Sequence, residues 1–241
     1  MFAKIRAFFR TYPYALLGLY PIFHILAFFL LGIYSPVRYV VESKLDALIP
    51  FCEWFIIPYY LWYPYLFLGM VAFLFVSRKD FLRMAVCTIG GMAVCITICI
   101  AFPTAIAFRP TSFDRSNPLI WLVEFTYAVD QPWNVFPSMH CFGAIGITIA
   151  VWKSEILCKL KWMRPASGAL CILICMATVF VKQHSVLDFF GAVVLALLFY
   201  PLAYCVRWKF LQGNDVADLA ADFYRKSLKQ DKKQKLSEPL Q

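Results

Sequence analysis

Two of the three histidines in this 241-residue sequence stand in settings suited to proton transfer and nucleophilic chemistry. His140 closes the tetrapeptide Pro-Ser-Met-His, and His184 is followed four residues later by Asp188. On a helix, a carboxylate at that spacing can accept a hydrogen bond from one ring nitrogen and leave the other nitrogen free as a nucleophile. A second histidine can protonate the leaving oxygen as a general acid. The pattern predicts a catalytic set of His184, Asp188 and His140.

Three further residues are candidates for binding an anion such as phosphate. Arg109 carries a planar guanidinium that can form two parallel hydrogen bonds to phosphate. Ser138 stands at the expected start of a helix, where free backbone N–H groups favour anions, and Lys182 is a second cation just before His184. Each feature has a structural alternative, because a lysine can extend to a membrane interface and a histidine–aspartate pair can simply stabilise a helix start. The combination favours phosphoryl transfer.

No metal and no other cofactor is expected for this chemistry. Carboxylate clusters suited to Mg²⁺ are absent near the histidines, and the nine cysteines include no Cys-x-x-Cys pair. Most cysteines stand inside apolar runs, as Cys95 and Cys171 do. They are typical of small apolar side chains in a membrane core.

The composition indicates which elements must position these residues. Hydrophobic residues make up 62% of the chain and charged residues only 15%, whereas a soluble domain has about half and about a quarter. A membrane-spanning helix needs roughly 20 mostly apolar residues. Six segments approach that length, at residues 15–34, 54–76, 81–102, 139–152, 166–181 and 187–206. The sequence therefore predicts an all-α integral membrane protein built as a bundle of six transmembrane helices.

The distribution of lysine and arginine predicts the orientation of this bundle. With six spans, four basic segments fall on one side of the membrane: the N-terminus, the second-to-third loop, the fourth-to-fifth loop and the tail. Loops rich in Lys and Arg favour the cytoplasm, so both termini are expected there. The loops at 35–53 and 103–138 balance their basic residues with acidic ones. Arg109, His140 and His184 are accordingly expected on the non-cytoplasmic face, in a protein of the plasma membrane.

The chain divides into a membrane domain and a tail. Residues 1–210 hold the six spans, and residues 211–241 form a polar, lysine-rich segment. A basic tail can bind nucleic acid, but a cytoplasmic membrane flank accounts for it more simply. We therefore expect the bilayer, and no nucleic acid, as a partner of this chain.

The ordered motifs resemble those of a known family. Arg109-Pro110, the Pro-Ser-Met-His ending at His140, and His184 with Asp188 are similar to the three signature motifs of the type 2 phosphatidic acid phosphatase (PAP2) superfamily. The resemblance covers about residues 81–206. It implies a six-helix core in which His184 becomes phosphorylated, Asp188 orients it, His140 protonates the leaving group and Arg109 binds phosphate. It also implies that no metal is required.

The sequence departs from the family pattern at two cations. The family has a lysine seven residues before the arginine, where this chain has Phe102, and a Ser-Arg pair where this chain has Ala177 and Thr178. Lys182 is a candidate substitute at a different offset. The pattern Phe-x-Lys-Gln-His ending at His184 is closer to the branch with inositol phosphorylceramide synthase-like proteins and many bacterial phosphatase-like members.

These observations predict a membrane lipid phosphatase that hydrolyses a phosphate or pyrophosphate monoester of a lipid through a phosphohistidine. The phosphorylated lipid is the expected partner. Two alternatives stay open on the residues alone. One is a phosphotransferase that passes a phospho-head group to a lipid alcohol or ceramide, as the synthase-like branch suggests. The other is a catalytically inactive membrane scaffold or transporter, which the two replaced cations favour and the retained histidines oppose.

Overall fold

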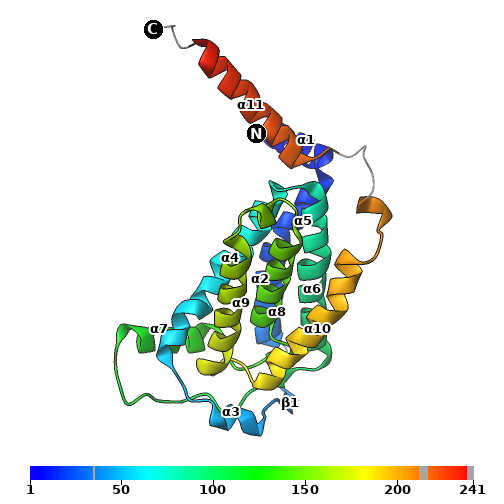
Figure 1. Cartoon of the computed structure of the whole chain (residues 1–241). Coiled ribbons are helices and arrows are strands. Elements are labelled where there is room, and N and C mark those ends of the chain that lie inside the picture. The colour runs from blue at the N-terminus through cyan, green and yellow to red at the C-terminus, as the bar shows by residue number, and fades with distance from the viewer. Residues whose placement is uncertain (35, 212–216, 238–241) are drawn as a thin grey trace.

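A computed structural model describes residues 1–34, 36–211 and 217–237 of the chain, and most of these residues are helical (Figure 1). The only strands among them are β1 (Tyr39–Val40) and β2 (Thr104–Ala105), which pair in parallel. The longer helices lie roughly alongside one another, and the short elements gather at the two ends of the bundle. The helices of the bundle are α2 (Tyr20–Tyr34), α4 (Ile56–Leu74), α5 (Arg78–Met84), α6 (Gly90–Ala101), α8 (Met139–Lys153), α9 (Met163–Phe180) and α10 (Val186–Tyr204).

Short helical segments extend or connect these elements. The 3-10 segments η1 (Pro13–Leu19) and η2 (Glu53–Phe55) lead into α2 and α4, and the π-helical turn η3 (Ala85–Ile89) joins α5 to α6. The other short ones are α1 (Phe2–Thr11), α3 (Lys44–Leu48), α7 (Pro118–Val129), η4 (Leu157–Lys159) and η5 (Lys209–Leu211). A longer helix outside the bundle, α11 (Leu219–Ser237), follows near the C-terminus. The sequence did not predict α3 or α7 within the long connections, because both are too short to register as spans.

Among the described residues, five helical segments are long and apolar enough to cross a membrane, so the architecture is that of an all-α membrane protein. They are Pro13–Ile33, Glu53–Leu74, Arg78–Ala101, Met163–Phe180 and Val186–Tyr204. Each overlaps a segment that the sequence predicted. The sixth predicted segment coincides with α8, which has only 15 residues. At a rise of about 1.5 Å per residue, α8 is shorter than the hydrocarbon layer of a bilayer.

Helix α8 forms the centre of the bundle, packed against α4, α9 and α10. Its glycines allow close approach: a Cβ atom at Gly146 would lie 2.6 Å from Thr88 Oγ1. Across the same contact, a Cβ atom at Gly91 of α6 would lie 1.9 Å from the Phe142 ring of α8. Small residues at such contacts are how helices pack tightly in membranes. Because its neighbours enclose α8, most of this helix is buried in protein.

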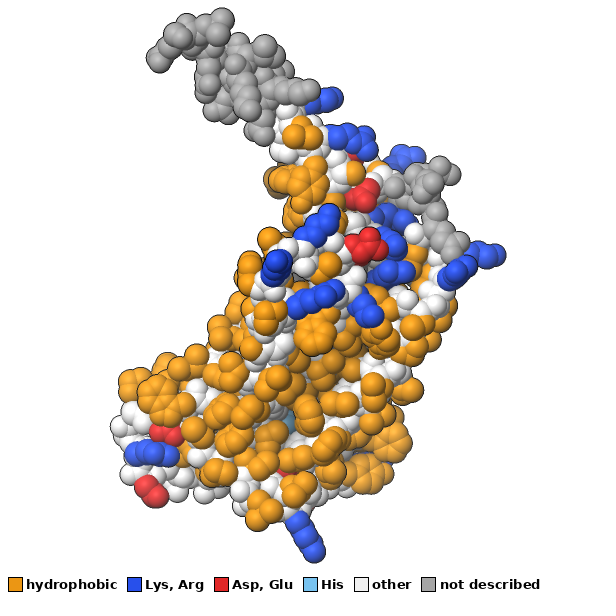
Figure 2. All heavy atoms as spheres, in the orientation of Figure 1, with side chains coloured by type: hydrophobic (Ala, Val, Ile, Leu, Met, Phe, Trp, Pro, Cys, Tyr) orange, Lys and Arg blue, Asp and Glu red, His pale blue; other side chains and the backbone are white. Residues whose placement is uncertain are grey.

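The two ends of the bundle differ in charge. One end, which we call the histidine end, contains α3, β1, the start of α8 and the turn between α9 and α10. The opposite end, which we call the basic end, contains α1, the start of α5, η4 and η5, and most of the Lys and Arg side chains in view gather there (Figure 2). This segregation matches the predicted grouping of the basic segments.

The predicted tail begins near α11, whose first turns contact the basic end. The Tyr12 hydroxyl donates to the Asp222 carboxylate, and the backbone N–H of Leu219 donates to the Tyr14 hydroxyl at 2.7 Å. The ring of Phe223 packs against Phe75 at the end of α4, with centroids 5.5 Å apart. Burial and the Asp222 carboxylate raise the pKa of Tyr12 to about 12, with the hydrogen bond to Asp222 as the largest cause. The start of the tail is therefore attached to the first helices.

Candidate active site

The turn between α9 and α10 brings His184 and Asp188 together. The backbone N–H groups of Gln183 and His184 both donate to the Thr178 carbonyl, at 2.9 and 3.0 Å, which turns the chain at the end of α9. Ser185 then caps α10, and its own N–H donates to Asp188 Oδ2 at 2.9 Å in a reciprocal capping box. The local sequence thus starts α10 one residue after Ser185 and places Asp188 one turn along, facing His184.

His184 and Asp188 form a buried pair. Nδ1 of His184 lies 3.2 Å from Oδ2 of Asp188, and the Asp188 side chain is fully buried. Burial by itself would lower the pKa of His184, but the hydrogen bond to Asp188 and its negative charge more than offset this and raise the pKa above its ordinary value. If Nδ1 donates its proton to Asp188, then Nε2 of His184 has a free lone pair on the opposite side of the ring.

His140 faces that second nitrogen of His184. Its Nδ1 lies 3.4 Å from His184 Nε2. The His140 ring packs among aromatic side chains of α4, with centroid distances of 4.7 Å to Tyr59 and 4.3 Å to Trp62. Its Nε2 is buried and has no hydrogen-bond partner among the described residues. The two histidines and Asp188 therefore form a continuous row, with His184 in the middle.

Arg109 reaches the same place from the long connection between β2 and α7. Its guanidinium donates to the Asp130 carbonyl at 2.8 Å and to Oε1 of Gln183. The group lies over the Tyr127 ring, 4.8 Å from the centroid. Burial lowers the pKa of Arg109, although nearby Asp130 opposes this, and arginine remains charged at neutral pH. The positive charge of Arg109 thus lies beside Gln183, the residue that directly precedes His184.

Arg109, His140 and His184 line one small cavity, together with Asp130 and Gln183. Apolar side chains that include Phe28, Val135 and Met139 complete its wall. The cavity measures about 20 Å³. A single water needs about 10–15 Å³, so a phosphoryl group can enter only if lining side chains move.

Two residues that the sequence nominated for phosphate lie outside this cavity. Ser138 is fully buried, and its hydroxyl accepts from the Cys141 N–H at 3.3 Å, so that it caps α8. The ammonium group of Lys182 donates to the carbonyl of Asp46 at 2.7 Å and to that of Ile49. Burial lowers the pKa of Lys182, and the charge of Asp46 counteracts this. Both side chains therefore stabilise the surroundings of the histidines without facing the cavity.

Two residues near the histidines were not anticipated. The carboxylate of Asp46 accepts from the Ser185 hydroxyl at 2.6 Å and from the Val186 N–H at 2.8 Å, so it caps the start of α10 from another segment. The sequence signal was the spacing of Ser43 and Asp46, a capping-box pattern that predicts a short helix but not its docking. No pattern in the sequence predicted that Gln183 would accept a hydrogen bond from Arg109.

No group of three or more His, Cys, Asp or Glu side chains within the described residues is arranged to hold a metal ion. Comparisons with protein-family models, with curated proteins and with solved structures found no match for this chain. The interpretation of the site therefore depends on its residues and their geometry.

Proposed function

We propose that this chain is a membrane lipid phosphatase of the PAP2 type, which hydrolyses a phosphate or pyrophosphate monoester of a lipid through a phosphohistidine on His184. The observation that carries the proposal is the row formed by His140, His184 and Asp188 beside the Arg109 guanidinium. Each position matches a distinct need of phosphoryl transfer: an acid, a nucleophile, a group that orients the nucleophile, and a cation for the phosphate oxygens.

The first step forms the phosphohistidine. Asp188 holds the proton on Nδ1 of His184, so the lone pair on Nε2 attacks phosphorus while the bond from phosphorus to the lipid oxygen breaks. His140 donates a proton to that oxygen, and the lipid alcohol leaves. Arg109 stabilises the phosphoryl oxygens, for which it must exchange its contact with Gln183 for contacts with the substrate. The same exchange gives the phosphoryl group room in the cavity.

The second step restores the enzyme. His140, now without its extra proton, removes a proton from water as the water oxygen attacks phosphorus. The bond between phosphorus and Nε2 of His184 breaks, and inorganic phosphate leaves. The positive charge on the His184 ring is stabilised in both steps by Asp188, whose second oxygen is buried and has no partner among the described residues.

The proposal includes an orientation in the membrane. We take α8 as a sixth span enclosed by the other helices, place the histidine end at the non-cytoplasmic face of the plasma membrane, and place both termini in the cytoplasm. The support is the gathering of Lys and Arg at the basic end, since cytoplasmic flanks favour these residues. A phosphorylated lipid in the non-cytoplasmic leaflet would then have its phosphate head group at the same depth as His184.

Transfer to a lipid alcohol or ceramide is the second candidate, because the cavity has room for only about one water. Phe28, Val135 and Met139 are among the apolar residues of its lining. A transferase must keep water away from its phosphoenzyme, and a cavity this small serves that need. The first step would be the same, and only the acceptor in the second step would differ.

One experiment separates these functions. Purified protein is incubated with phosphatidic acid, a prenyl diphosphate and an inositol phospholipid, each with and without diacylglycerol or ceramide, and free phosphate and new lipids are measured. Phosphate release that the His184→Ala variant lacks supports the phosphatase. Formation of a new phospholipid without phosphate release supports the transferase. Absence of both products with every substrate would contradict an enzymatic function.

A further inference from the structure

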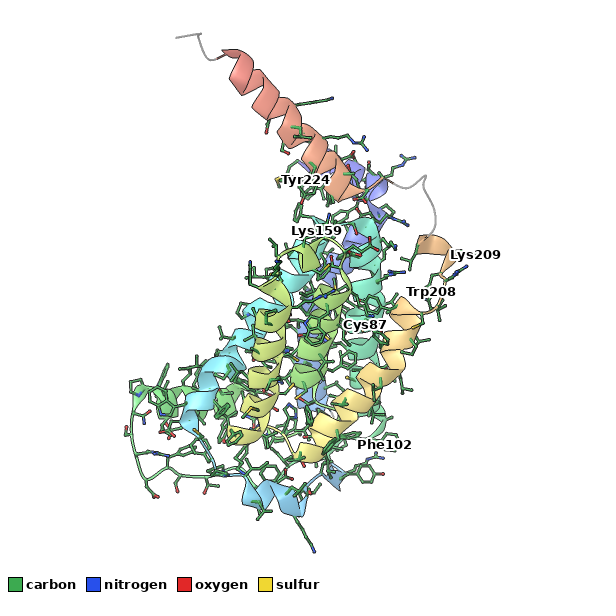
Figure 3. The ribbon with its side chains drawn as sticks, in the orientation of Figure 1. Cys87, Phe102, Lys159, Trp208, Lys209 and Tyr224 are labelled. Atoms are coloured by element: carbon green, nitrogen blue, oxygen red, sulfur yellow. The ribbon has the colours of Figure 1, made fainter. Side chains whose placement is uncertain are left out.

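A second cavity lies at the basic end of the bundle, far from the histidines. It measures about 440 Å³ and lies between the start of α5 and the end of α10. Three cationic side chains line it, from Lys79, Arg83 and Arg207, and no acidic residue is among its described lining residues. Trp208 and Tyr204 supply aromatic walls. Figure 3 places Trp208 and Lys209 just beyond α10, at the same end of the molecule as Lys159.

The polar groups of this cavity are incompletely satisfied by the protein itself. Nε of Arg83 and the hydroxyl of Tyr204 are both buried and have no hydrogen-bond partner among the described residues. The two side chains contact each other, with the Arg83 guanidinium 5.9 Å from the centroid of the Tyr204 ring. Buried polar groups are normally paired, so these donors indicate an absent acceptor. The acceptor that suits two donors and three positive charges is a phosphate group.

The surroundings of the cavity indicate that the phosphate belongs to a lipid. The part of α10 that precedes the cavity carries exposed apolar side chains, which include Leu197, Leu198 and Leu202. Such a surface accepts acyl chains along its length. Trp208 lies just beyond the end of α10. Indole side chains favour the boundary between acyl chains and head groups, so this position suits a membrane interface. A head group in the cavity would therefore leave its tails alongside the apolar part of α10.

We propose that Lys79, Arg83 and Arg207 bind the phosphate of an anionic phospholipid at the basic end of the bundle. This site is separate from the cavity of His140 and His184, which lies at the opposite end. It is a lipid-binding site without a catalytic group, and it does not depend on the proposed enzymatic function. Basic pockets between membrane helices are a known chemical solution for holding anionic head groups.

The test uses the whole chain in detergent micelles, with bound lipids counted by native mass spectrometry. Dioleoyl phosphatidylglycerol is the anionic probe, and dioleoyl phosphatidylcholine is the neutral comparison. The variants Lys79→Gln, Arg83→Gln and Arg207→Gln each remove one cation from the cavity. The matched control is Lys159→Gln, which removes an exposed cation from η4 at the same end but outside the cavity lining. Inorganic phosphate is added as a competitor in a separate series.

We expect phosphatidylglycerol to bind in preference to phosphatidylcholine, and each cavity variant to weaken it about fivefold, as a loss of about one basic charge near the lipid surface predicts. Lys159→Gln should bind like the original protein, and millimolar phosphate should displace little lipid. Equal weakening by Lys159→Gln, or equal binding of both lipids, would overturn the site. Displacement of the lipid by phosphate at the same concentration would show a site for free phosphate instead.

The Arg207→Gln variant distinguishes loss of a lipid contact from loss of folding. Arg207 is exposed and lies beyond the end of α10, so its replacement leaves the packing of the bundle unchanged. Unaltered phosphatidylglycerol binding in this variant, together with weaker binding in Arg83→Gln, would mean that Arg83 acts through the fold and would count against the proposal.

Discussion

The carboxylate of Asp46 accepts a hydrogen bond of 2.6 Å from the hydroxyl of Ser185, although 139 positions separate the two residues in the chain. Ser185 directly follows His184 and caps the helix that carries Asp188. The ammonium of Lys182, on the other side of His184, donates to the carbonyl of Asp46. The short helix α3 is thus attached to the chain both before and after His184, which restrains the turn that carries His184 from both sides.

The first prediction concerns this attachment. Asp46→Ala leaves the Ser185 hydroxyl and the Val186 N–H without their buried partner, and each such group costs about 1–3 kcal/mol. We expect a lower melting temperature and, under conditions where the variant is folded, a lower kcat with little change in KM. Asp46→Asn keeps an acceptor of the same shape and should recover part of kcat. The control is Asp114→Ala, which removes an exposed carboxylate. An unchanged kcat in folded Asp46→Ala would show that the attachment is irrelevant to the site.

The second prediction separates the two histidines. His184→Ala should lose the phosphoenzyme and all turnover. His140→Ala should retain more activity on an aryl phosphate, whose leaving group needs little protonation, than on an alkyl lipid phosphate. General acid catalysis contributes about 10²–10⁴-fold, so the difference between the substrates is measurable by phosphate release. Labelling that survives in His184→Ala and disappears in His140→Ala would exchange the two roles.

The third prediction is a pH dependence. The pKa of His184 is raised above its ordinary value because the interaction with Asp188 outweighs the effect of burial. Since the nucleophile must be unprotonated at Nε2, kcat/KM should fall as the pH decreases through a value above 6.5, the usual pKa of histidine. Asp188→Asn removes the raising charge, so the acid limb should move to lower pH while the maximal rate falls. An acid limb that stays in place in Asp188→Asn would mean that another group titrates there.

The fourth prediction addresses Arg109. Arg109→Lys keeps the charge but cannot offer two parallel hydrogen bonds. Loss of one charge-assisted hydrogen bond costs about 1.5–3 kcal/mol, so kcat/KM should fall about tenfold to a hundredfold. Arg115→Lys is the matched control, because Arg115 lies in the same connection but is 62% exposed and pairs with Glu53. Equal effects in the two variants would remove the case for a specific phosphate contact.

The fifth prediction concerns metal ions and inhibition. Among the described residues that line the cavity, Asp130 is the one carboxylate, and it accepts from the Tyr59 hydroxyl at 2.5 Å. Such a lining has few of the oxygen ligands that Mg²⁺ prefers. Activity should therefore persist in EDTA, and vanadate should inhibit as a mimic of the transferring phosphoryl group. Loss of activity in EDTA that Mg²⁺ restores would contradict a mechanism based on Arg109 and the histidines alone.

The sequence predicted the elements that depend on local pattern. Apolar runs of about 20 residues mark membrane helices because the bilayer sets their length, and five of the expected runs are helices of that kind. The pairing of His184 with Asp188 was predictable from their four-residue spacing at an expected helix start, although His184 itself lies in the turn before the Ser185 cap. The catalytic roles assigned to these residues remain predictions.

Contacts between distant segments were decided only by the tertiary structure. The ammonium of Lys182 donates to the carbonyls of Asp46 and Ile49, and Lys182 does not line the cavity of the histidines. Asp46 is one of the acidic residues in the 35–53 connection, yet it is buried against Ser185. Spacing along the chain can specify which residues share one helix face. It cannot specify which side chain from another segment satisfies the free N–H groups at the start of α10, because that depends on how all the helices pack together.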